Sequence, residues 1–546
     1  MEGILMKKLT KTLLLTAALS AGLSMPAMAA NVQATLPSFP VTLNGTVIDN
    51  SYRQYPLLVY NNITYFPMTY YDCRFLGVET EWTQANGLKI EKSNLTGAYH
   101  QQNVQQKNGG KVTAQTATGK IAVNGKAIAN SKEQYPLLVY RDVTYFPLTW
   151  RFAVDEFGWK YSYDNKNGLV IDAGNVKTSS VALQDMRQNR GIYDNSDFII
   201  DKNYLYYQGE NGSVYRRPLA ALDDDKQRKQ IMEIPYEGVY VEGYPRAGFY
   251  EERGHVYMQY HLGGATMGSD LLYRIDGDTV SENLIQKQYD IVSDFGDLQV
   301  QIPRSVIGGI NPAKITVKTA QSSREVGEAG KIYNLVANGY QKEKNELYVL
   351  AADWEQETGT QGDSYLYRLN LYTDTFQKVY YEPVEDCVYD GADYYIWQDL
   401  QHQIWDGATV YGADTDSYML SLLDLPNGEK KPVAKVNGYT AIAKHGVYYQ
   451  ATATKELIFW NKQTGKTETI NAGFKVNQLY SQNGYIVAHF EEMPENPYRL
   501  MVFAPSGQTM KQVYATADCS DQAVINADGL LVYRLEGTNQ LVQVQL

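Results

Sequence analysis

The sequence predicts a mainly β protein, and three observations support this prediction. The first is composition: the 546-residue chain has 46 Tyr and 44 Gly but only 14 Phe, and tyrosine and glycine favour strands joined by tight turns. The second is a duplicated segment near the N-terminus. The third is a long C-terminal region of short strand-like segments that recur at regular steps.

Charge and length limit the classes of function. The chain carries 49 Lys and Arg against 61 Asp and Glu, whereas nucleic acid phosphates are bound by basic surfaces. We therefore expect no nucleic-acid partner, and composition also argues against a helical bundle or a membrane transporter. Because 546 residues exceed one compact core, we expect several domains or one large ring of repeats.

The first 29 residues are typical of an export signal. Three lysines, an apolar stretch and a small-x-small site follow one another: Lys7, Lys8, Lys11, residues 13–23, and Ala27-Met28-Ala29. The apolar stretch is too short to span a bilayer comfortably, and no other run approaches that length. We predict a signal peptide over 1–29 and a secreted or extracellular mature protein, or one associated with the cell wall, with no membrane span.

Three cysteines are too few for a disulfide scaffold in an exported chain of this length. At most one disulfide could form among Cys73, Cys387 and Cys519, and the sequence leaves open which two would pair. Buried free thiols are the favoured interpretation.

Residues 44–70 and 124–150 are copies of one another. Seventeen of these 27 positions are identical at an offset of 80, and the match resumes at an offset of 81, which indicates internal duplication. Each copy predicts a strand, a short helix that starts at the next proline and stops at Gly77 or Gly158, and a two-residue Asn-Gly hairpin. Neither copy is large enough to fold alone, so we expect a shared core, with loop or weak strand over 91–120.

Both copies contain an Asn-Gly pair, a proline before an apolar stretch and a Thr-Tyr-Phe-Pro segment. These motifs are Asn44-Gly45, Pro56, Thr64-Tyr65-Phe66-Pro67-Met68 and Trp82, and then Asn124-Gly125, Pro136 and Thr144-Tyr145-Phe146-Pro147-Leu148. By them, residues 30–175 resemble the copper amine oxidase-like N-terminal domain, or stalk domain, common in exported proteins of Gram-positive bacteria. The resemblance implies paired α+β repeats. The family's arginine after the Pro-Leu pair is replaced by Thr69 and Thr149, so no ligand role is transferred from it.

The resemblance does not extend to oxidase chemistry. Copper amine oxidases make their quinone from a tyrosine in an Asn-Tyr-Asp or Asn-Tyr-Glu context and hold copper with a His-x-His pair and a third histidine. Here Asn203-Tyr204 is followed by Leu205, and the six histidines form no His-x-His pair. We expect no amine oxidase activity, no copper and no quinone cofactor.

From about residue 178 the chain alternates between short strand-like segments and polar turns. Seven markers of this pattern are spaced by 52, 91, 47, 53, 39 and 44 residues: Tyr204, Val256, Leu347, Tyr394, Val447, Ile486 and Leu530. The step of 91 is close to two steps, and residues 298–302 could mark a degenerate unit inside it. Units of 40–50 residues with about four strands predict a β-propeller over 178–546.

We prefer seven blades, with six or eight as alternatives, and expect residues 178–200 to complete a blade with the C-terminal strands and so close the ring. The tyrosine-rich pattern also resembles, more loosely, the low-density-lipoprotein-receptor-type propeller of bacterial domains of unknown function. No Tyr-Trp-Thr-Asp element is present.

Motifs of serine hydrolases, phosphate-binding loops and zinc helices are absent from the sequence. His255 and His261 would share one face of a strand, without an evident third metal ligand. Aspartates at 223–225, 276–278, 414 and 416 form no complete calcium loop, and turn formation is the favoured interpretation. We assign no catalytic residue, metal site or cofactor, although the aspartate spacing leaves calcium open.

The richest aromatic stretch contains the candidate binding residues Tyr394, Tyr395, Trp397 and Trp405. Their rings could stack on sugars or hold a peptide, although packing between blades is the favoured interpretation. We predict a non-catalytic binding or scaffold protein of the bacterial cell envelope or extracellular space, whose propeller presents a protein- or glycan-binding surface. The alternative is a polysaccharide-active hydrolase or lyase with its site in the propeller funnel.

Overall fold

The computed structural model of the chain divides into two compact units, Met1–Asn175 and Val176–Leu546. The structure describes residues 29–93, 96–97, 99, 102–175, 178–187, 196–238, 243–264, 268–285, 290–303, 312–400, 418–471, 474–491, 499–507, 509–535 and 538–546. Of the predicted cleavage site, Ala29 is described and exposed, and Ala27 lies outside the described residues. Within the described ranges, no helix is long and apolar enough to cross a membrane.

A closed six-stranded barrel forms the centre of the first unit, and each repeat contributes three strands to it. The strand order is β1 (Asn31–Thr35), β4 (Leu58–Tyr60), β5 (Ile63–Pro67), β12 (Val143–Pro147), β11 (Leu138–Tyr140) and β8 (Lys111–Thr116). The copies meet where β1 pairs with β8 and where β5 pairs with β12, with Phe66 opposite its repeat equivalent Phe146. Repeat-related side chains fill the barrel: Ala34 and Ala114, Leu58 and Leu138, Tyr65 and Tyr145.

Two small sheets lock the copies together because each sheet takes strands from both. One has the order β10 (Lys126–Ala127), β9 (Ile121–Val123), β7 (Gly87–Lys92) and β6 (Val78–Thr83); the other has the order β13 (Lys160–Asp164), β14 (Gly168–Asp172), β2 (Val41–Leu43) and β3 (Thr46–Val47). β7 runs parallel to β9, and β14 runs parallel to β2. The late hairpin of each copy therefore pairs with the early hairpin of the other.

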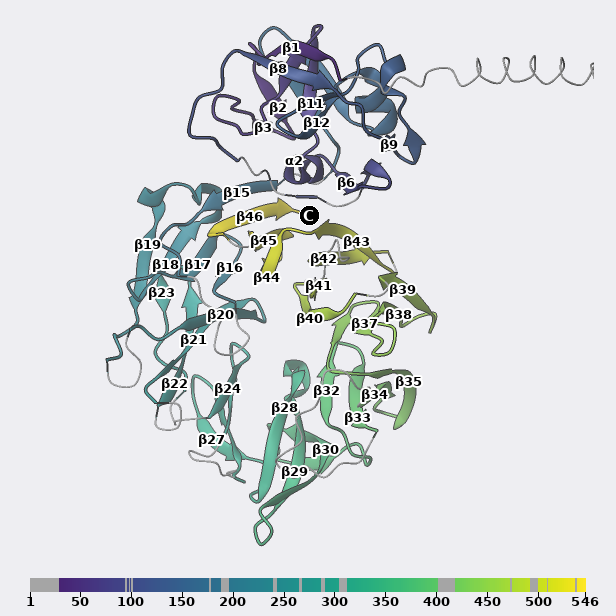
Figure 1. The fold of residues 1–546 in the computed structure, drawn as a ribbon. Helices are drawn as coiled ribbons and strands as arrows, with labels where there is room; N and C mark the ends of the chain where they lie inside the picture. The colour runs from purple at the N-terminus through teal and green to yellow at the C-terminus, as the bar shows by residue number, and fades with distance from the viewer. Residues whose placement is uncertain are drawn as a thin grey trace, which may run out of the picture. The chain divides into compact units, whose positions relative to one another are not determined.

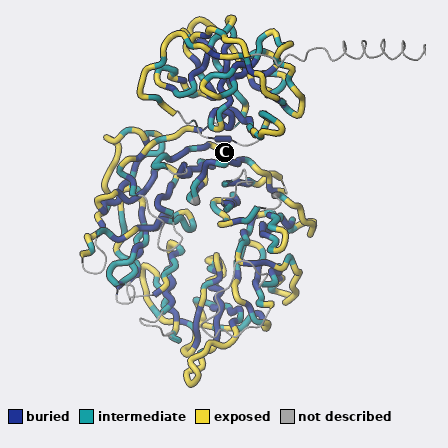
Figure 2. Tube along the Cα trace, in the orientation of Figure 1, coloured by how far each residue is buried: buried dark blue, intermediate teal, exposed yellow. Residues whose placement is uncertain are grey.

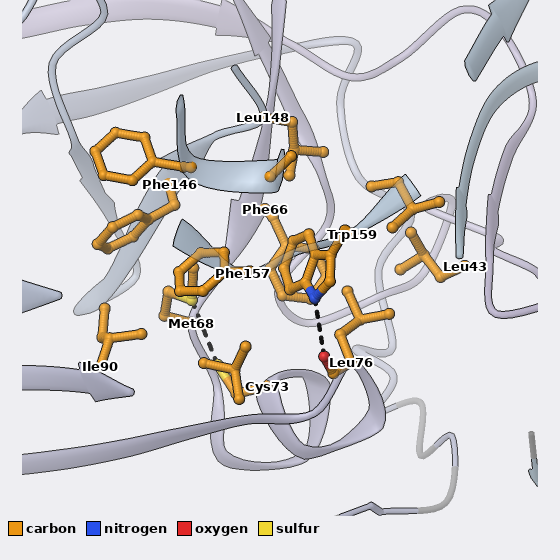
Figure 3. Close-up of a cluster of buried hydrophobic side chains, with 14 of the residues drawn as sticks. Leu43, Phe66, Met68, Cys73, Leu76, Ile90, Phe146, Leu148, Phe157 and Trp159 are labelled. Atoms are coloured by element: carbon orange, nitrogen blue, oxygen red, sulfur yellow. Dashed lines mark hydrogen bonds between the residues drawn. The ribbon is translucent and has the colours of Figure 1, made fainter. Parts of the chain in front are cut away.

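One hydrophobic core joins the two copies, as expected. It contains Phe66 and Met68 from the first copy with Phe146 and Trp159 from the second, all buried (Figure 3). The Trp159 indole Nε1–H donates to the Leu76 carbonyl at 3.0 Å. This hydrogen bond satisfies the one polar group of a fully buried ring.

Three local predictions for the repeats need correction. Pro67 ends strand β5 opposite Tyr145 and does not begin a helix. The helix, α2 (Tyr70–Phe75), starts after Thr69, whose hydroxyl accepts the Asp72 N–H at 3.1 Å and so caps the helix. The hairpin loops span three residues, 84–86 and 165–167, instead of two. Residues 91–120 supply β8, a full barrel strand, because β1 provides it with a partner.

Gly77 ends helix α2 with a φ of +68°, and Gly158 has a φ of +73° after the corresponding helical turn of the second copy. Both glycines end their helices as predicted. That second turn, η2 (Arg151–Glu156), is a π-helix. It differs from α2 because the second copy carries one residue more before its glycine.

The described strands of the second unit form eight four-stranded blades, which follow one another around a ring (Figure 1). Blades 1 to 4 are β16 (Phe198–Ile200), β17 (Tyr204–Gln208), β18 (Ser213–Pro218), β19 (Lys229–Glu233); β20 (Ala247–Glu252), β21 (His255–Leu262), β22 (Ser269–Asp276), β23 (Thr279–Val280); β24 (Ile291–Asp294), β25 (Gln299–Ile302), β26 (Ile315–Lys318), β27 (Ser323–Val326); and β28 (Lys331–Gln341), β29 (Glu346–Glu355), β30 (Thr360–Asn370), β31 (Phe376–Lys378).

Blades 5 to 8 are β32 (Asp386–Tyr389), β33 (Tyr394–Asp399), β34 (Tyr418–Asp424), β35 (Glu429–Val436); β36 (Thr440–Ala443), β37 (Gly446–Gln450), β38 (Leu457–Asn461), β39 (Thr467–Asn471); β40 (Val476–Gln482), β41 (Tyr485–Phe490), β42 (Leu500–Ser506), β43 (Thr509–Thr516); and β44 (Cys519–Ile525), β45 (Leu530–Leu535), β46 (Gln540–Gln545) with β15 (Thr178–Ala182). The preferred count of seven is not confirmed. The alternative of eight agrees with the described strands, because residues 298–302 belong to a complete blade.

The ring closes by pairing strands from both ends of the second unit, as predicted. β15 runs antiparallel to β46, from Thr178 opposite Val544 to Ala182 opposite Gln540. It supplies the outer strand of blade 8, whose other three strands come from the end of the chain. The outermost C-terminal strand is thereby covered instead of remaining an open edge.

Tyrosine fills the spaces between blades, which accounts for much of its excess in the composition. Tyr395 and Tyr449 pack between blades 5 and 6, and the hydroxyls of Tyr514 and Tyr533 lie 3.0 Å apart between blades 7 and 8. Buried segments run along the blades, whereas the long β29–β30 hairpin ends in an exposed tip (Figure 2). Cys73, Cys387 and Cys519 are buried and are not joined in a disulfide, which confirms the favoured interpretation of buried thiols.

Candidate functional site

A groove of about 640 Å³ lies between blades 4 and 5. These two blades are joined into one sheet by a single parallel bridge between Ala337 and Val388. Four tyrosines and six charged side chains line the groove: Tyr348, Tyr381, Tyr389, Tyr394, Lys344, Arg368, Lys378, Glu346, Asp393 and Asp424. We call this the blade 4–5 groove.

The tyrosines of the groove come from equivalent strands of the two neighbouring blades. Tyr348 lies on β29 and Tyr394 on β33, the second strands of their blades, and their ring centroids are 5.2 Å apart. Tyr389, at the end of β32, lies 4.8 Å from Tyr394. Tyr348 and Tyr394 are buried, Tyr389 is half-buried and Tyr381 is exposed. The aromatic lining is therefore graded from a packed floor to an accessible edge.

Hydrogen bonds hold the floor of the groove in place. The Gln341 side-chain amide donates to the Tyr394 hydroxyl at 2.6 Å, and the Tyr348 hydroxyl donates to Glu346 Oε2 at 3.2 Å. Burial raises the pKa of both phenols above the usual value for tyrosine. Both hydroxyls therefore stay neutral at physiological pH and act as hydrogen-bonding groups, not as charges.

Most charged groups of the groove already have protein partners. Arg368 lies 3.3 Å from Glu346 and donates to the Gln377 side chain at 2.9 Å. Asp393 is paired with Lys462 of blade 6, and the Lys378 ammonium lies 3.4 Å from the Tyr365 ring centroid. With three cationic and three acidic side chains in the lining, the groove suits a polar ligand of low net charge.

The predicted binding aromatics have different places. Tyr394 lines the blade 4–5 groove, whereas Tyr395 and Trp397 are buried in the core between blades 5 and 6. Side chains alternate between the two faces of a strand. On β33, Tyr394 therefore faces blade 4, whereas Tyr395 and Trp397 face blade 6. Trp405 lies outside the described residues. The three described residues thus do not form one exposed binding surface. Tyr395 and Trp397 pack between blades, which was the favoured interpretation.

Sequence patterns missed Tyr348, Arg368 and Lys344 as groove residues. Tyr348 follows the marker Leu347 of the blade period, so its strand was predicted, but nothing in the sequence shows which strand of the next blade it meets. The pairing of blades 4 and 5 decides that contact.

Polar candidates outside the groove are engaged in structural contacts. His261 Nδ1 lies 2.8 Å from Asp270, Asp225 accepts a hydrogen bond from Arg217 at 2.6 Å, and Asp278 accepts from Arg216 and Lys229. Those two donors hold the pKa of Asp278 at about 2. Within the described parts of the chain, no three His, Cys, Asp or Glu side chains are grouped to hold a metal ion; positions 414 and 416 lie outside them.

Comparison with known proteins gives no family. No family model matches the chain, and no curated protein matches it in sequence. The resemblance of residues 30–175 to the copper amine oxidase-like domain therefore stays a prediction.

Several solved structures are similar to this chain at low scores. The computationally designed Ika8 protein has a TM-score of 0.36 at 11% identity, over 67% of this chain and 97% of its own. An acylaminoacyl peptidase from Pyrococcus horikoshii has a TM-score of 0.35 at 12% identity, over 53% of this chain and 49% of its own. The β-propeller domain of the Trilobed protease from Pyrococcus furiosus has a TM-score of 0.34 at 9% identity, over 55% of this chain and 93% of its own. Because these scores are low, the propeller assignment rests on the strand pairings of this chain.

Proposed function

We propose that this chain is an exported, non-catalytic binding or scaffold protein of the bacterial cell envelope or extracellular space, with a protein or glycan ligand in the blade 4–5 groove. One observation carries this proposal. The groove combines the tyrosines of two blades with polar groups whose charges are balanced within the protein. Such a lining offers ring faces and hydrogen-bonding groups to a ligand.

The contacts of the groove carboxylates favour ligand binding over hydrolysis as the function of the groove. Glu346 accepts the Tyr348 hydroxyl and pairs with Arg368, and Asp393 pairs with Lys462. A glycosidase acid must instead present its carboxyl group to the oxygen of the leaving group, whereas these two carboxylates face an arginine and a lysine of the protein. These paired carboxylates are placed to position side chains of the groove.

Export and envelope location rest on the sequence. The signal-like residues 1–29 and the stalk-like repeats over 30–175 support a secreted protein, associated with the cell wall or free outside the cell. In this proposal the protein works without copper, quinone or another cofactor.

The proposal can be tested on the mature chain, residues 30–546, with a glycan array and a pull-down from purified envelope proteins. Binding without product release is expected. Replacing Lys344 and Tyr389 together by alanine should weaken binding at least about tenfold, because both side chains line the groove.

The matched control is Tyr236→Ala, which removes an exposed tyrosine that does not line the groove, and it should bind as the wild type does. Unchanged binding in the groove variant would contradict the site. Release of sugar or peptide products by the wild-type protein would contradict the non-catalytic function.

A further inference from the structure

The first unit exposes large aromatic rings at the same two positions of both repeats. Tyr70 is 49% exposed and its repeat equivalent Trp150 is 62% exposed; Trp82 is 69% exposed and its equivalent Tyr163 is 56% exposed. Other aromatic pairs of the repeats, such as Phe66 and Phe146, are fully buried. Since large rings are normally buried at least in part, exposure at repeat-related positions needs a reason other than packing.

In the second copy these rings belong to a row along an edge strand. Tyr161 and Tyr163 lie on the same face of β13, which among the described strands pairs with β14 alone. The Trp150 ring lies 6.2 Å from Tyr161, and the Phe39 ring lies 5.2 Å from Tyr163. Every residue of β13 is exposed. The row is therefore continuous and open to solvent along the described strand.

The first copy carries exposed rings on two elements that pack together. Helix α2 begins with Tyr70 and packs on β6, the strand that carries Trp82. β6 is also the edge strand of its sheet. Thr80 stands where the second copy has Tyr161, so this site has two rings.

An arginine–glutamate pair accompanies the exposed ring in each copy. Arg74 is buried beneath the exposed ring: it binds Glu79, which is partly exposed, at 2.6 Å and lies 3.8 Å from the Tyr70 ring centroid. Arg151, next to Trp150 in the chain, binds Glu133 at 2.6 Å. The two pairs come from different repeat positions. In the first copy the arginine contacts the exposed ring, whereas in the second copy Arg151 follows Trp150 in sequence and lies 4.9 Å from the Phe152 ring centroid.

This combination fits a sugar. Aromatic faces pack on the C–H face of a sugar ring, and guanidinium and carboxylate groups exchange hydrogen bonds with hydroxyls. Residues 30–175 carry 13 Lys and Arg against 11 Asp and Glu, a near balance that suits a chain of low charge better than a polyanion. A ligand made of repeating units can occupy two equivalent sites on one body, which raises its overall affinity.

We propose that the first unit binds a polysaccharide through two repeat-related sites, the first-copy site (Tyr70 and Trp82) and the second-copy site (Trp150, Tyr161 and Tyr163). This function is separate from the blade 4–5 groove and does not depend on it. It makes the duplicated unit a glycan-binding module.

The test is co-sedimentation of the mature protein with insoluble peptidoglycan, chitin and cellulose, combined with tryptophan fluorescence during titration with their soluble oligosaccharides. We expect binding to at least one of the three and a change in tryptophan emission. Replacing Trp150 and Tyr163 by alanine should weaken binding at least about tenfold, as should replacing Tyr70 and Trp82. The fourfold variant should not bind.

The matched control is Tyr52→Ala, an exposed tyrosine whose repeat equivalent is Lys132; its binding should be unchanged. Since the replaced rings are exposed, all variants should keep the wild-type melting temperature within a few degrees. Binding that persists in the fourfold variant, or failure of all three polymers to bind, would overturn the proposal. So would a change of oligomeric state in place of a change in glycan binding, because it would assign the rings to a protein interface.

Discussion

Both ring nitrogens of His261 face hydrogen-bond acceptors. Nδ1 lies 2.8 Å from Asp270 Oδ1, and Nε2 lies 3.1 Å from the Gly264 carbonyl. Only the protonated imidazole can donate to both. Burial alone would lower the pKa of His261, but the hydrogen bonds and the negative charge of Asp270 outweigh it and raise the pKa above the usual value.

A raised folded-state pKa makes stability depend on pH in a known direction. The contribution of His261 is fully present below its unfolded pKa of about 6.5 and is lost as pH rises through the higher folded value. The loss should stay below about 1 kcal/mol because the pair is partly solvated. Melting curves of wild type and His261→Gln between pH 5 and 9 check this: their difference should shrink above pH 6.5. A difference that grows with pH would contradict it.

The exchange of hairpins between repeats depends on two glycines. The Leu88 N–H donates to the Lys120 carbonyl at 2.9 Å, and the Leu169 N–H donates to the Pro40 carbonyl at 3.0 Å. A Cβ on Gly168 would lie 2.0 Å from the Pro40 oxygen, and a Cβ on Gly87 would lie 2.1 Å from the Lys120 oxygen. Each hairpin thus approaches the other repeat too closely for a side chain.

Alanine at Gly168 should therefore destabilise the first unit by about 2–4 kcal/mol, from backbone strain at its positive φ and the clash with the carbonyl. Gly125→Ala is the matched control: its φ of +75° is similar, but no atom lies within 4 Å of the added Cβ, so about 1–2 kcal/mol is expected. Hydrogen exchange of first-unit amides in the full chain measures both. Equal losses of stability in the two variants would show that the close approach of Gly168 to the Pro40 carbonyl is unimportant.

Closure of the propeller joins residues far apart in sequence. Ser179 on β15 lies opposite Gln543 on β46, and their side-chain oxygens are 3.5 Å apart. A cysteine pair at these two positions should form a disulfide and raise the free energy of unfolding by about 2–4 kcal/mol, because it closes a long loop. Melting with and without reductant measures the gain.

The control pairs Ser179→Cys with Gln545→Cys, one diagonal step away on the same strand, where the Cα separation of about 7–8 Å is too long for a disulfide. The native thiols are buried and should not react. A disulfide in the control and none in the test pair would contradict the observed register.

The order of elements in both units could be predicted from local signals. The duplication located the strand-helix-hairpin units, and Gly77 and Gly158 end their helices because only glycine takes a positive φ at little cost. The blade period could be recognised because seven of the eight described blades have a tyrosine in their second strand. This marker did not give the blade count, because blade 3 has no tyrosine in β25.

The sequence by itself determined the repeats, the mainly β class and the strands that close the ring, because alternation and turn residues act over a few positions. Only the tertiary structure decided that the repeats exchange hairpins, that Tyr394 faces the blade 4–5 groove while Tyr395 is buried, and that Tyr70, Trp82, Trp150 and Tyr163 are exposed. A strand with neighbours on both faces has apolar residues at every position. Which face meets which partner is then set by the packing of distant segments.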